Sequence, residues 1–225
     1  IMALHSDILP KAYCDELMEL CTDARPLPFE EAVSVIDESY GRSWKKVFSS
    51  IEETPIGSAS IAQVHRAVLK SGEEVVVKIQ RKGIYEMMAR DIEFIRKAIK
   101  LMPPISLKGM ADFDLVLDEL WSVTRDEMNF LTEASNIEEF ARRNKEVNFV
   151  QTPVLYQQYT TVHVLVMEYI DGCGIDEKDK LLEDGYDLKE IGSKLVDNYI
   201  KQVMDDGFFH ADPHSGNVKI RDGKI

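Results

Sequence analysis

The sequence has no apolar run that approaches the roughly 18 residues needed to cross a membrane. Cysteine is also scarce, since Cys14, Cys21 and Cys173 are the only three and show no CxxC spacing. That pattern excludes a zinc ribbon and a disulfide-stapled fold and predicts free thiols in a reducing compartment. The first residues lack the basic start and long apolar stretch of a secretion signal. We therefore expect a cytoplasmic protein, with any peripheral or anchored membrane contact made by segments outside this chain.

Positive charge is in short supply as well. Forty acidic side chains oppose 27 basic ones, which gives a formal net charge of −13. The bulk charge therefore lacks the phosphate-neutralising surface that general nucleic-acid binding needs, and nucleic acid is excluded as a general partner, although a local basic pocket is still allowed. With 225 residues, 44% hydrophobic and 30% charged, the chain can bury a real core in one large domain or two small lobes.

Helical periodicity is the main pattern along the chain. Gly41 and Gly207 provide helix ends, and Asp187 followed by Glu190 provides a helix start. The helices are expected over residues 29–40, a short piece carrying Trp44, Val47 and Phe48, residues 84–102, residues 112–143 as one long and bent helix, and residues 188–206.

Strand patterns occupy two other regions. Ile61 to Ile79 reads as an antiparallel hairpin with its turn at residues 70–73. Val154 to Tyr156 and Val162 to Tyr169 are also expected as strands, and the second is apolar enough to be buried on both faces. Asp171 and Gly172 end it.

The segment HADPHSGN, His210 to Asn217, carries the strongest chemical signal. Its H-x-D-x-x-x-x-N spacing is that of kinase catalytic loops, with Asp212 toward the attacking hydroxyl and Asn217 offering an amide oxygen to magnesium. Alternatively, it is a polar turn whose side chains satisfy local backbone donors. A zinc site of His210, Asp212 and His214 is a weaker alternative, because Pro213 disfavours the helix that would align the two histidines.

Lys78 lies near the end of the strand VVVKI, where a kinase places the lysine that pairs with ATP phosphates and a helix glutamate. Upstream, Gly57, Ser58, Ala59 and Ser60 form a small-residue segment that suits a phosphate-covering loop. Taken alone, the lysine is a surface residue at a strand end and the segment an ordinary turn.

The residues after the buried strand form a candidate adenine contact. In a two-lobed kinase the lobes join here, so the carbonyl of Glu168 and the amide of Ile170 would face the base. An ordinary strand end is the alternative. The order of small-residue loop, lysine strand, acidic helix, linker strand and His-x-Asp loop is the order that a kinase fold requires, and this favours the kinase interpretation.

These residues together resemble the UbiB family of atypical kinases, also called the ADCK or bc-one-activity family. Pro55 to Ile84 is similar to its alanine-rich loop and lysine strand, with GSAS in place of the usual alanines, and FFHADPHSGN is similar to its catalytic loop. EMNFLTEASN resembles its E-x-D segment, which carries over to Glu127 and places Asn129 where the family usually has Asp. The resemblance makes Glu133 the partner of Lys78.

The resemblance implies an α+β, protein-kinase-like fold of two lobes. In it, residues 1–50 are an N-terminal helical extension, residues 51–170 the small lobe with a helical insertion around Trp121, and residues 171–225 a truncated large lobe. It also implies ATP and Mg²⁺ as cofactors, an ATPase or small-molecule kinase activity, and support of ubiquinone or related isoprenoid-quinone synthesis, with a lipid or quinone precursor as partner.

Both ends of the chain read as cut. The family's K-x-G-Q motif would precede Ile1, and its magnesium-binding D-F-G-like segment would follow Ile225. We expect this piece alone to be poorly soluble and inactive, because a magnesium ligand is missing and one helix face loses its packing partners. That face is Ile191, Leu195, Tyr199 and Val203.

Three other functions stay open: a small-molecule kinase of the aminoglycoside or choline type, a non-catalytic nucleotide-binding scaffold and a zinc hydrolase. The first lacks the SIAQVH segment found at Ser60 to His65. Under the leading hypothesis Lys78 and Glu133 form an ion pair, and Asp212→Asn abolishes ATP turnover in the whole protein but spares nucleotide binding.

Overall fold

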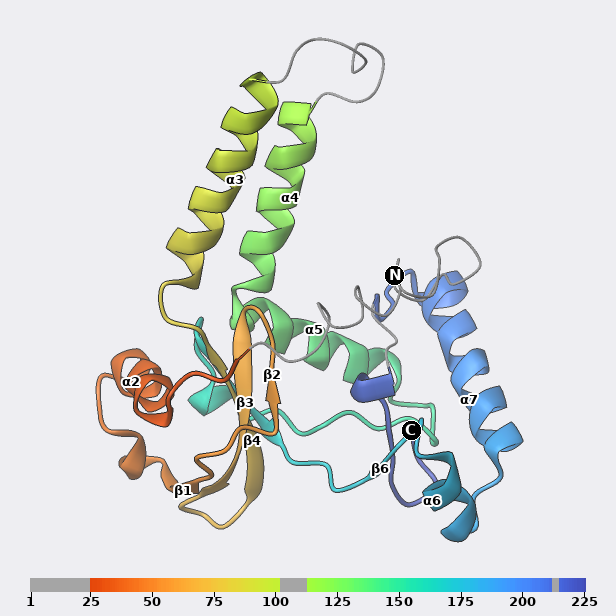
Figure 1. Ribbon diagram of the computed structural model, residues 1–225. Coiled ribbons are helices and arrows are strands. Elements are labelled where there is room, and N and C mark those ends of the chain that lie inside the picture. The colour runs from red at the N-terminus through yellow and green to blue at the C-terminus, as the bar shows by residue number, and fades with distance from the viewer. Residues whose placement is uncertain (1–24, 102–112, 212–214) are drawn as a thin grey trace.

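The computed structural model describes residues 25–101, 113–211 and 215–225, which form two lobes (Figure 1). The small lobe is built on an antiparallel sheet, and the large lobe on helices and a two-stranded sheet. The predicted α+β class is therefore confirmed. Within the described residues, no helix is both long and apolar enough to cross a membrane.

The five-stranded sheet has the order β1-β3-β4-β5, with the short β2 also paired to β3. Val64 of β3 is opposite Lys78 of β4, and Lys78 is opposite Leu165 of β5. The predicted hairpin over residues 61–79 is confirmed as β3 and β4. The strands are β1 (Phe48–Ile51), β2 (Gly57–Ser58), β3 (Ala62–Leu69), β4 (Glu74–Gln80) and β5 (Val164–Glu168).

Two short predictions are wrong in part. Phe48 begins strand β1 because it pairs with Leu69 across the sheet, so the helical piece before it is only the 3₁₀ turn η2 (Trp44–Lys46). The predicted strand at residues 154–156 makes one isolated bridge, between Leu155 and Met167.

The sheet is buried on both faces, as the apolar β5 predicted. Val164 and Val166 pack with helix α2 (Phe29–Tyr40), whereas Leu165 packs with Phe130 of helix α5 (Phe130–Arg143). This division follows from the alternation of side chains along a strand. Helix α2 ends as predicted at Gly41, whose φ of 60° is a left-handed conformation that suits glycine.

Helices α3 (Ile84–Leu101) and α4 (Phe113–Glu127) form a hairpin that projects from the small lobe (Figure 1). Tyr85 and Trp121 bring the two helices together, with ring centroids 5.2 Å apart. The single helix predicted over residues 112–143 is two helices, because Asn129 adopts an extended conformation and caps α5 by accepting a hydrogen bond from the Leu131 amide at 3.1 Å.

The large lobe contains strands β6 (Cys173–Gly174) and β7 (Lys219–Ile220), which pair with each other, and helices α6 (Lys178–Glu183) and α7 (Leu188–Lys201). Its core holds Cys173, Leu181, Ile191 and Ile220. Asp187 caps α7 as predicted, and Cys173 is a free thiol; Cys14 and Cys21 lie outside the described residues.

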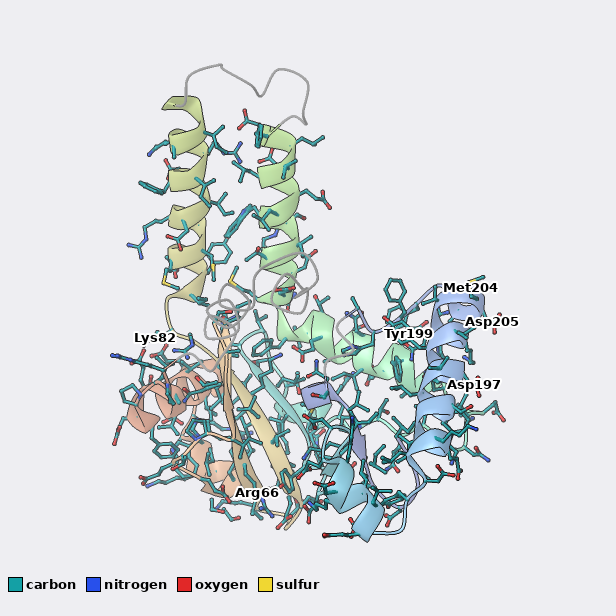
Figure 2. All side chains as sticks on the ribbon, turned by 45° about the vertical axis from the view of Figure 1, so that its right-hand side comes forward. Arg66, Lys82, Asp197, Tyr199, Met204 and Asp205 are labelled. Atoms are coloured by element: carbon teal, nitrogen blue, oxygen red, sulfur yellow. The ribbon has the colours of Figure 1, made fainter. Side chains whose placement is uncertain are left out.

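The last helix differs from its prediction in two ways. After Lys201 it widens into a π-helical turn, η4 (Gln202–Asp206), before ending at Gly207. Ile191, predicted to be exposed to solvent, is buried. The large apolar side chains exposed on this helix are Val196, Ile200, Val203 and Met204, and Figure 2 labels Met204 near its C-terminal end.

Candidate functional site

Lys78 lies on the face of the sheet that packs against α5. Its neighbours Val77 and Ile79 point into the core on the other face, so the alternation of β4 turns Lys78 toward α5. The ammonium donates to both carboxylate oxygens of Glu133, at 2.9 Å to Oε1 and 2.7 Å to Oε2. The predicted ion pair is thus present between two residues 55 positions apart.

This ion pair contributes little to folding. The two side chains are 29% and 35% exposed, and an ion pair with that access to water is worth about 0–1 kcal/mol. Glu133 lies in the first turn of α5, where the helix dipole favours a carboxylate. The pair therefore holds a positive charge in place at the sheet surface. Because the Lys78 side chain stays accessible to water, an anionic ligand could also reach it.

The small-residue segment forms the β2–β3 hairpin. Gly57 pairs with Val64, the residue that also faces Lys78, so Gly57 lies two strands, or roughly 10 Å, from the lysine backbone. The Ala59 amide donates to the Ala62 carbonyl at 2.8 Å, which closes the turn that contains Ser60. Apart from its two chain neighbours, no residue has an atom within 4 Å of the position that a Cβ on Gly57 would take, so this backbone has open space beside it.

Arg81, which was not predicted from the sequence, holds this turn through hydrogen bonds. Its guanidinium donates through Nε to the Ala59 carbonyl and through an Nη to the Ser58 hydroxyl, both at 2.8 Å. A third bond, of 3.0 Å, reaches the carbonyl of Arg25. The only hint in the sequence was its position three residues after Lys78. Its bonding partners are 22 to 56 residues away along the chain, and contacts over such separations leave no local pattern.

The SIAQVH segment places two polar residues inside the small lobe. Gln63 and His65 are fully buried, and Gln63 Nε2 lies 2.7 Å from His65 Nε2. The carboxamide oxygen of Gln63 accepts from the Leu27 amide, so its NH₂ group faces the histidine and donates to it. His65 then bonds the Glu52 carbonyl through Nδ1, and burial lowers the pKa of the imidazole.

The linker residues Glu168 and Ile170 lie between the two lobes. The Glu168 carboxylate accepts from Arg221 of the large lobe at 2.9 Å, and the Ile170 carbonyl accepts from Lys219 at 3.0 Å. Tyr169 between them has Arg66 over its ring at 4.2 Å and Lys219 at 5.5 Å. The predicted adenine contacts are therefore on the segment that connects the lobes.

The catalytic-loop segment is described only in part, because Asp212, Pro213 and His214 lie outside the described residues. The backbone of His210 is held on both sides, since its amide donates to Gln202 and its carbonyl accepts from Tyr199. Asn217 lies in the 3₁₀ turn η5 (Ser215–Asn217), just before β7. No group of three metal-binding side chains occurs among the described residues; the zinc alternative involves Asp212 and His214, which are not among them.

The site thus combines a lysine–glutamate pair, a short hairpin two strands away in the same sheet, a linker between the lobes and a polar loop after a helix. This is the arrangement of a kinase-like site. Residues 19–224 match the family described as the ABC1 atypical kinase-like domain. The chain belongs to this ABC1 family. The predicted resemblance to UbiB and ADCK proteins is confirmed, because relatives carry the names ACTIVITY OF BC1 COMPLEX KINASE and AarF domain-containing protein kinase.

Three relatives illustrate how widely ABC1 sequences are shared. The chain is 42% identical over its whole length to an uncharacterized protein in the hydrogenase 1 5′ region of Clostridium pasteurianum. It is 39% identical over 96% of its length to the chloroplastic ACTIVITY OF BC1 COMPLEX KINASE 8 of Arabidopsis thaliana, and 33% identical over 95% to AarF domain-containing protein kinase 1 of Gallus gallus. It spans only 42%, 29% and 41% of these proteins.

A solved structure supports the same fold for this ABC1 chain. Rv3197 from Mycobacterium tuberculosis, determined in complex with erythromycin, superimposes with a TM-score of 0.72 at 29% sequence identity. The match covers 99% of this chain and 57% of that one. The predicted kinase-like architecture is therefore confirmed for nearly the whole chain.

Proposed function

We propose that this ABC1 chain binds Mg·ATP and that the whole protein is an ATP-dependent enzyme of the UbiB type. The activity is either ATP hydrolysis or phosphoryl transfer to a small molecule, and it supports the synthesis of ubiquinone or a related isoprenoid quinone. The partner is then a lipid or quinone precursor, which the whole protein would bind at a membrane.

The observation that supports the proposal best is the bidentate pair of Lys78 and Glu133. A lysine on a sheet strand can bind phosphate oxygens only if its ammonium is held in a fixed position, and an ion pair with a helix glutamate does this. A pair whose side chains are only partly buried does little for stability, so binding an anion explains it better than folding does.

The remaining roles follow from position in a kinase-like site. The β2–β3 turn at Gly57 to Ser60 would cover the phosphates with backbone amides, and the Glu168 carbonyl and Ile170 amide would meet the adenine edge. Asp212 would accept the proton of the attacking hydroxyl, and the Asn217 amide oxygen suits Mg²⁺, which prefers oxygen ligands and supplies charge neutralisation at the phosphates.

Nucleotide binding tests this proposal directly. The affinity of the whole protein for a fluorescent ATP analogue should fall by about tenfold or more in Lys78→Met, since a charge-assisted bond is worth about 1.5–3 kcal/mol. Lys82→Met is the matched control, because Lys82 is an exposed lysine of the same segment that pairs with Glu38. Asp212→Asn should bind the analogue normally but not turn ATP over. Wild-type protein that binds no nucleotide would contradict the proposal.

The quinone role needs a separate measurement. Cells that lack the protein should contain less isoprenoid quinone, and the wild-type gene but not Asp212→Asn should restore it. Unchanged quinone content would remove this part of the proposal and leave ATP binding in place.

A macrolide is a second candidate ligand, because the structure of Rv3197 was determined with erythromycin. Titration of the whole protein with erythromycin, with and without ATP, tests whether this chain shares that ligand. Binding that requires Lys78 would indicate a small-molecule substrate or inhibitor at the nucleotide site.

A further inference from the structure

A chain of three buried amide side chains links the two lobes. Asn144, Asn198 and Gln202 are 4%, 6% and 5% exposed. Asn198 Nδ2 donates to Asn144 Oδ1 and Gln202 Nε2 donates to Asn198 Oδ1, both at 2.6 Å. Burying an amide is costly unless it is hydrogen-bonded, and a network of this kind tolerates few alternative arrangements.

One end of this amide chain reaches the segment that enters the catalytic loop. Gln202 Oε1 accepts from the His210 amide at 3.0 Å, two residues before Asp212 in the sequence. Tyr199 donates its hydroxyl to the His210 carbonyl at 2.9 Å; it lies on the side of α7 nearer to α5, whereas Asp197 points away (Figure 2). Gln202 begins the π-helical turn η4, and such turns occur frequently at functional sites.

The other end reaches the helix that carries Glu133. Asn144 is the C-terminal cap of α5, and its Nδ2 donates to the Phe140 carbonyl of that helix at 3.0 Å. A second set of bonds joins the same two helix ends: Lys201 donates to the Arg143 carbonyl at 3.1 Å, and Arg143 donates to the Asp206 carbonyl at 2.6 Å. Helix α5 belongs to the small lobe but is fastened at its C-terminus to the large lobe.

We propose that Asn144, Asn198 and Gln202 are positioning residues that hold the catalytic loop in a fixed relation to the Lys78–Glu133 pair. The inference rests on the proposed function, because phosphoryl transfer requires the loop and the phosphate-binding lysine to meet in one geometry. A misplacement of about 1 Å can cost on the order of 100-fold in rate. None of the three amides is among the proposed nucleotide contacts, so substituting them should lower ATP turnover more than nucleotide affinity.

Two substitutions of Gln202 test this in the whole protein. Gln202→Met keeps the length of the side chain but removes both hydrogen bonds, whereas Gln202→Glu keeps an acceptor for the His210 amide. We expect Gln202→Met to lower ATP turnover by about tenfold or more while nucleotide affinity changes by less than about threefold. Gln202→Glu should retain more turnover than Gln202→Met. Gln157→Met, which removes an exposed bond to Glu138, is the control and should change neither quantity.

A second readout does not depend on nucleotide. Hydrogen exchange at the His210 amide should accelerate in Gln202→Met but not in Gln157→Met. Tyr199→Phe removes only the hydroxyl of a partly exposed side chain and should show a smaller turnover defect of the same kind, which keeps the inference testable if Gln202→Met does not fold. Parallel losses of affinity and turnover, equal activity of the two Gln202 variants, or unchanged exchange would overturn it. Wild-type protein without nucleotide binding would instead overturn the proposed function, and the exchange result would still decide whether Gln202 holds the loop.

Discussion

Arg81 joins three parts of the small lobe through one guanidinium group. It bonds the Ala59 carbonyl and Ser58 hydroxyl of the β2–β3 turn and the carbonyl of Arg25, ahead of helix α2. A turn with small side chains has no packing of its own to fix its position, so the arginine supplies the constraint. The conformation of the turn is then constrained by a residue that lies outside the turn.

Removal of this brace should weaken nucleotide binding without unfolding the protein. Because three exposed or half-buried hydrogen bonds are lost, we expect Arg81→Ala to lower the free energy of unfolding by about 1–2 kcal/mol and the ATP affinity by about 3- to 10-fold. Arg81→Lys should recover part of the loss. Thermal melting and analogue titration measure both effects, and Lys82→Ala is the neighbouring control. Equal affinities in Arg81→Ala and wild type would show that the turn holds its shape unaided.

His65 gives the small lobe a pH dependence with a defined sign. Burial lowers the pKa of its imidazole below the ordinary value near 6.5, because the charged form is disfavoured away from water, and the Nε2 lone pair is already occupied by the bond from Gln63. The unfolded chain therefore binds a proton at a higher pH than the folded one, and this contribution to stability, complete above about pH 6.5, is lost as the pH falls through the folded pKa.

The measurement is the free energy of unfolding at pH 7.5 and 5.5. Wild type should lose stability across this interval, and His65→Gln, which does not titrate, should lose less while being less stable at pH 7.5. An identical change in both proteins would mean that other groups account for the pH dependence.

At the scale of elements, local signals determined which predictions succeeded. Helix α2 and the β3–β4 hairpin were predicted because the apolar pattern of each element and the residues that end it are close together in the sequence. The division between α4 and α5 was missed because Asn129 is an acceptable residue within a helix, and only its capping bond to the Leu131 amide ends the helical run. Strand β1 was missed because it is defined by pairing with β3, about 20 residues away.

Of the candidate site, the ion pair was predicted from the sequence, whereas the residues that hold the neighbouring backbone were not. Lys78 and Glu133 carry recognisable neighbours in the sequence, so the resemblance joined them across 55 residues. Arg81 and Gln202 act through backbone groups of other segments, and a backbone carbonyl or amide leaves no residue-specific signal. The ion pair was therefore easier to predict from the sequence than the residues that bond to the backbone around it.

The cap at Asn129 can be tested by itself. Asn129→Ala should lower the free energy of unfolding by about 1 kcal/mol, because the Leu131 amide loses its acceptor, whereas Asn129→Asp should be neutral or slightly stabilising, since Asp caps equally well and favours the helix N-terminus. Chemical denaturation measures both, and Leu131→Ala, an exposed position of the same turn, controls for a change of side chain without loss of the cap. Equal stability of Asn129→Ala and wild type would rule out this role for the side chain.

For the molecule as a whole, the junction of the two lobes includes Tyr169, which contacts both of them. Its ring contacts Arg66 of the small lobe and Lys219 of the large lobe, and such a contact contributes about 0.5–1 kcal/mol where water has access to the ring. The Glu168–Arg221 ion pair joins the same two lobes beside it. The linker is thus held by contacts from both sides.

Tyr169→Ala should loosen this junction. We expect faster hydrogen exchange in β7 and a nucleotide affinity lowered by about 3- to 10-fold, with little change in the melting of the small lobe. Tyr85→Ala is the matched control, because that ring contacts Trp121 on the projecting hairpin. Slower or unchanged exchange in β7 would contradict a role for the ring in lobe orientation.

The joint between the projecting hairpin and α5 has one further consequence. The Met128 carbonyl accepts from the buried side chain of Gln80 at 2.7 Å, and the Phe130 amide donates to the Val162 carbonyl at 3.1 Å, so the two residues flanking Asn129 are both attached to the sheet region. These two bonds lie between the hairpin and the first turn of α5, so a displacement of α3 and α4 would have to strain them before it could reach Glu133. The Lys78–Glu133 pair is thereby separated from the projecting hairpin by two attachments to the sheet region.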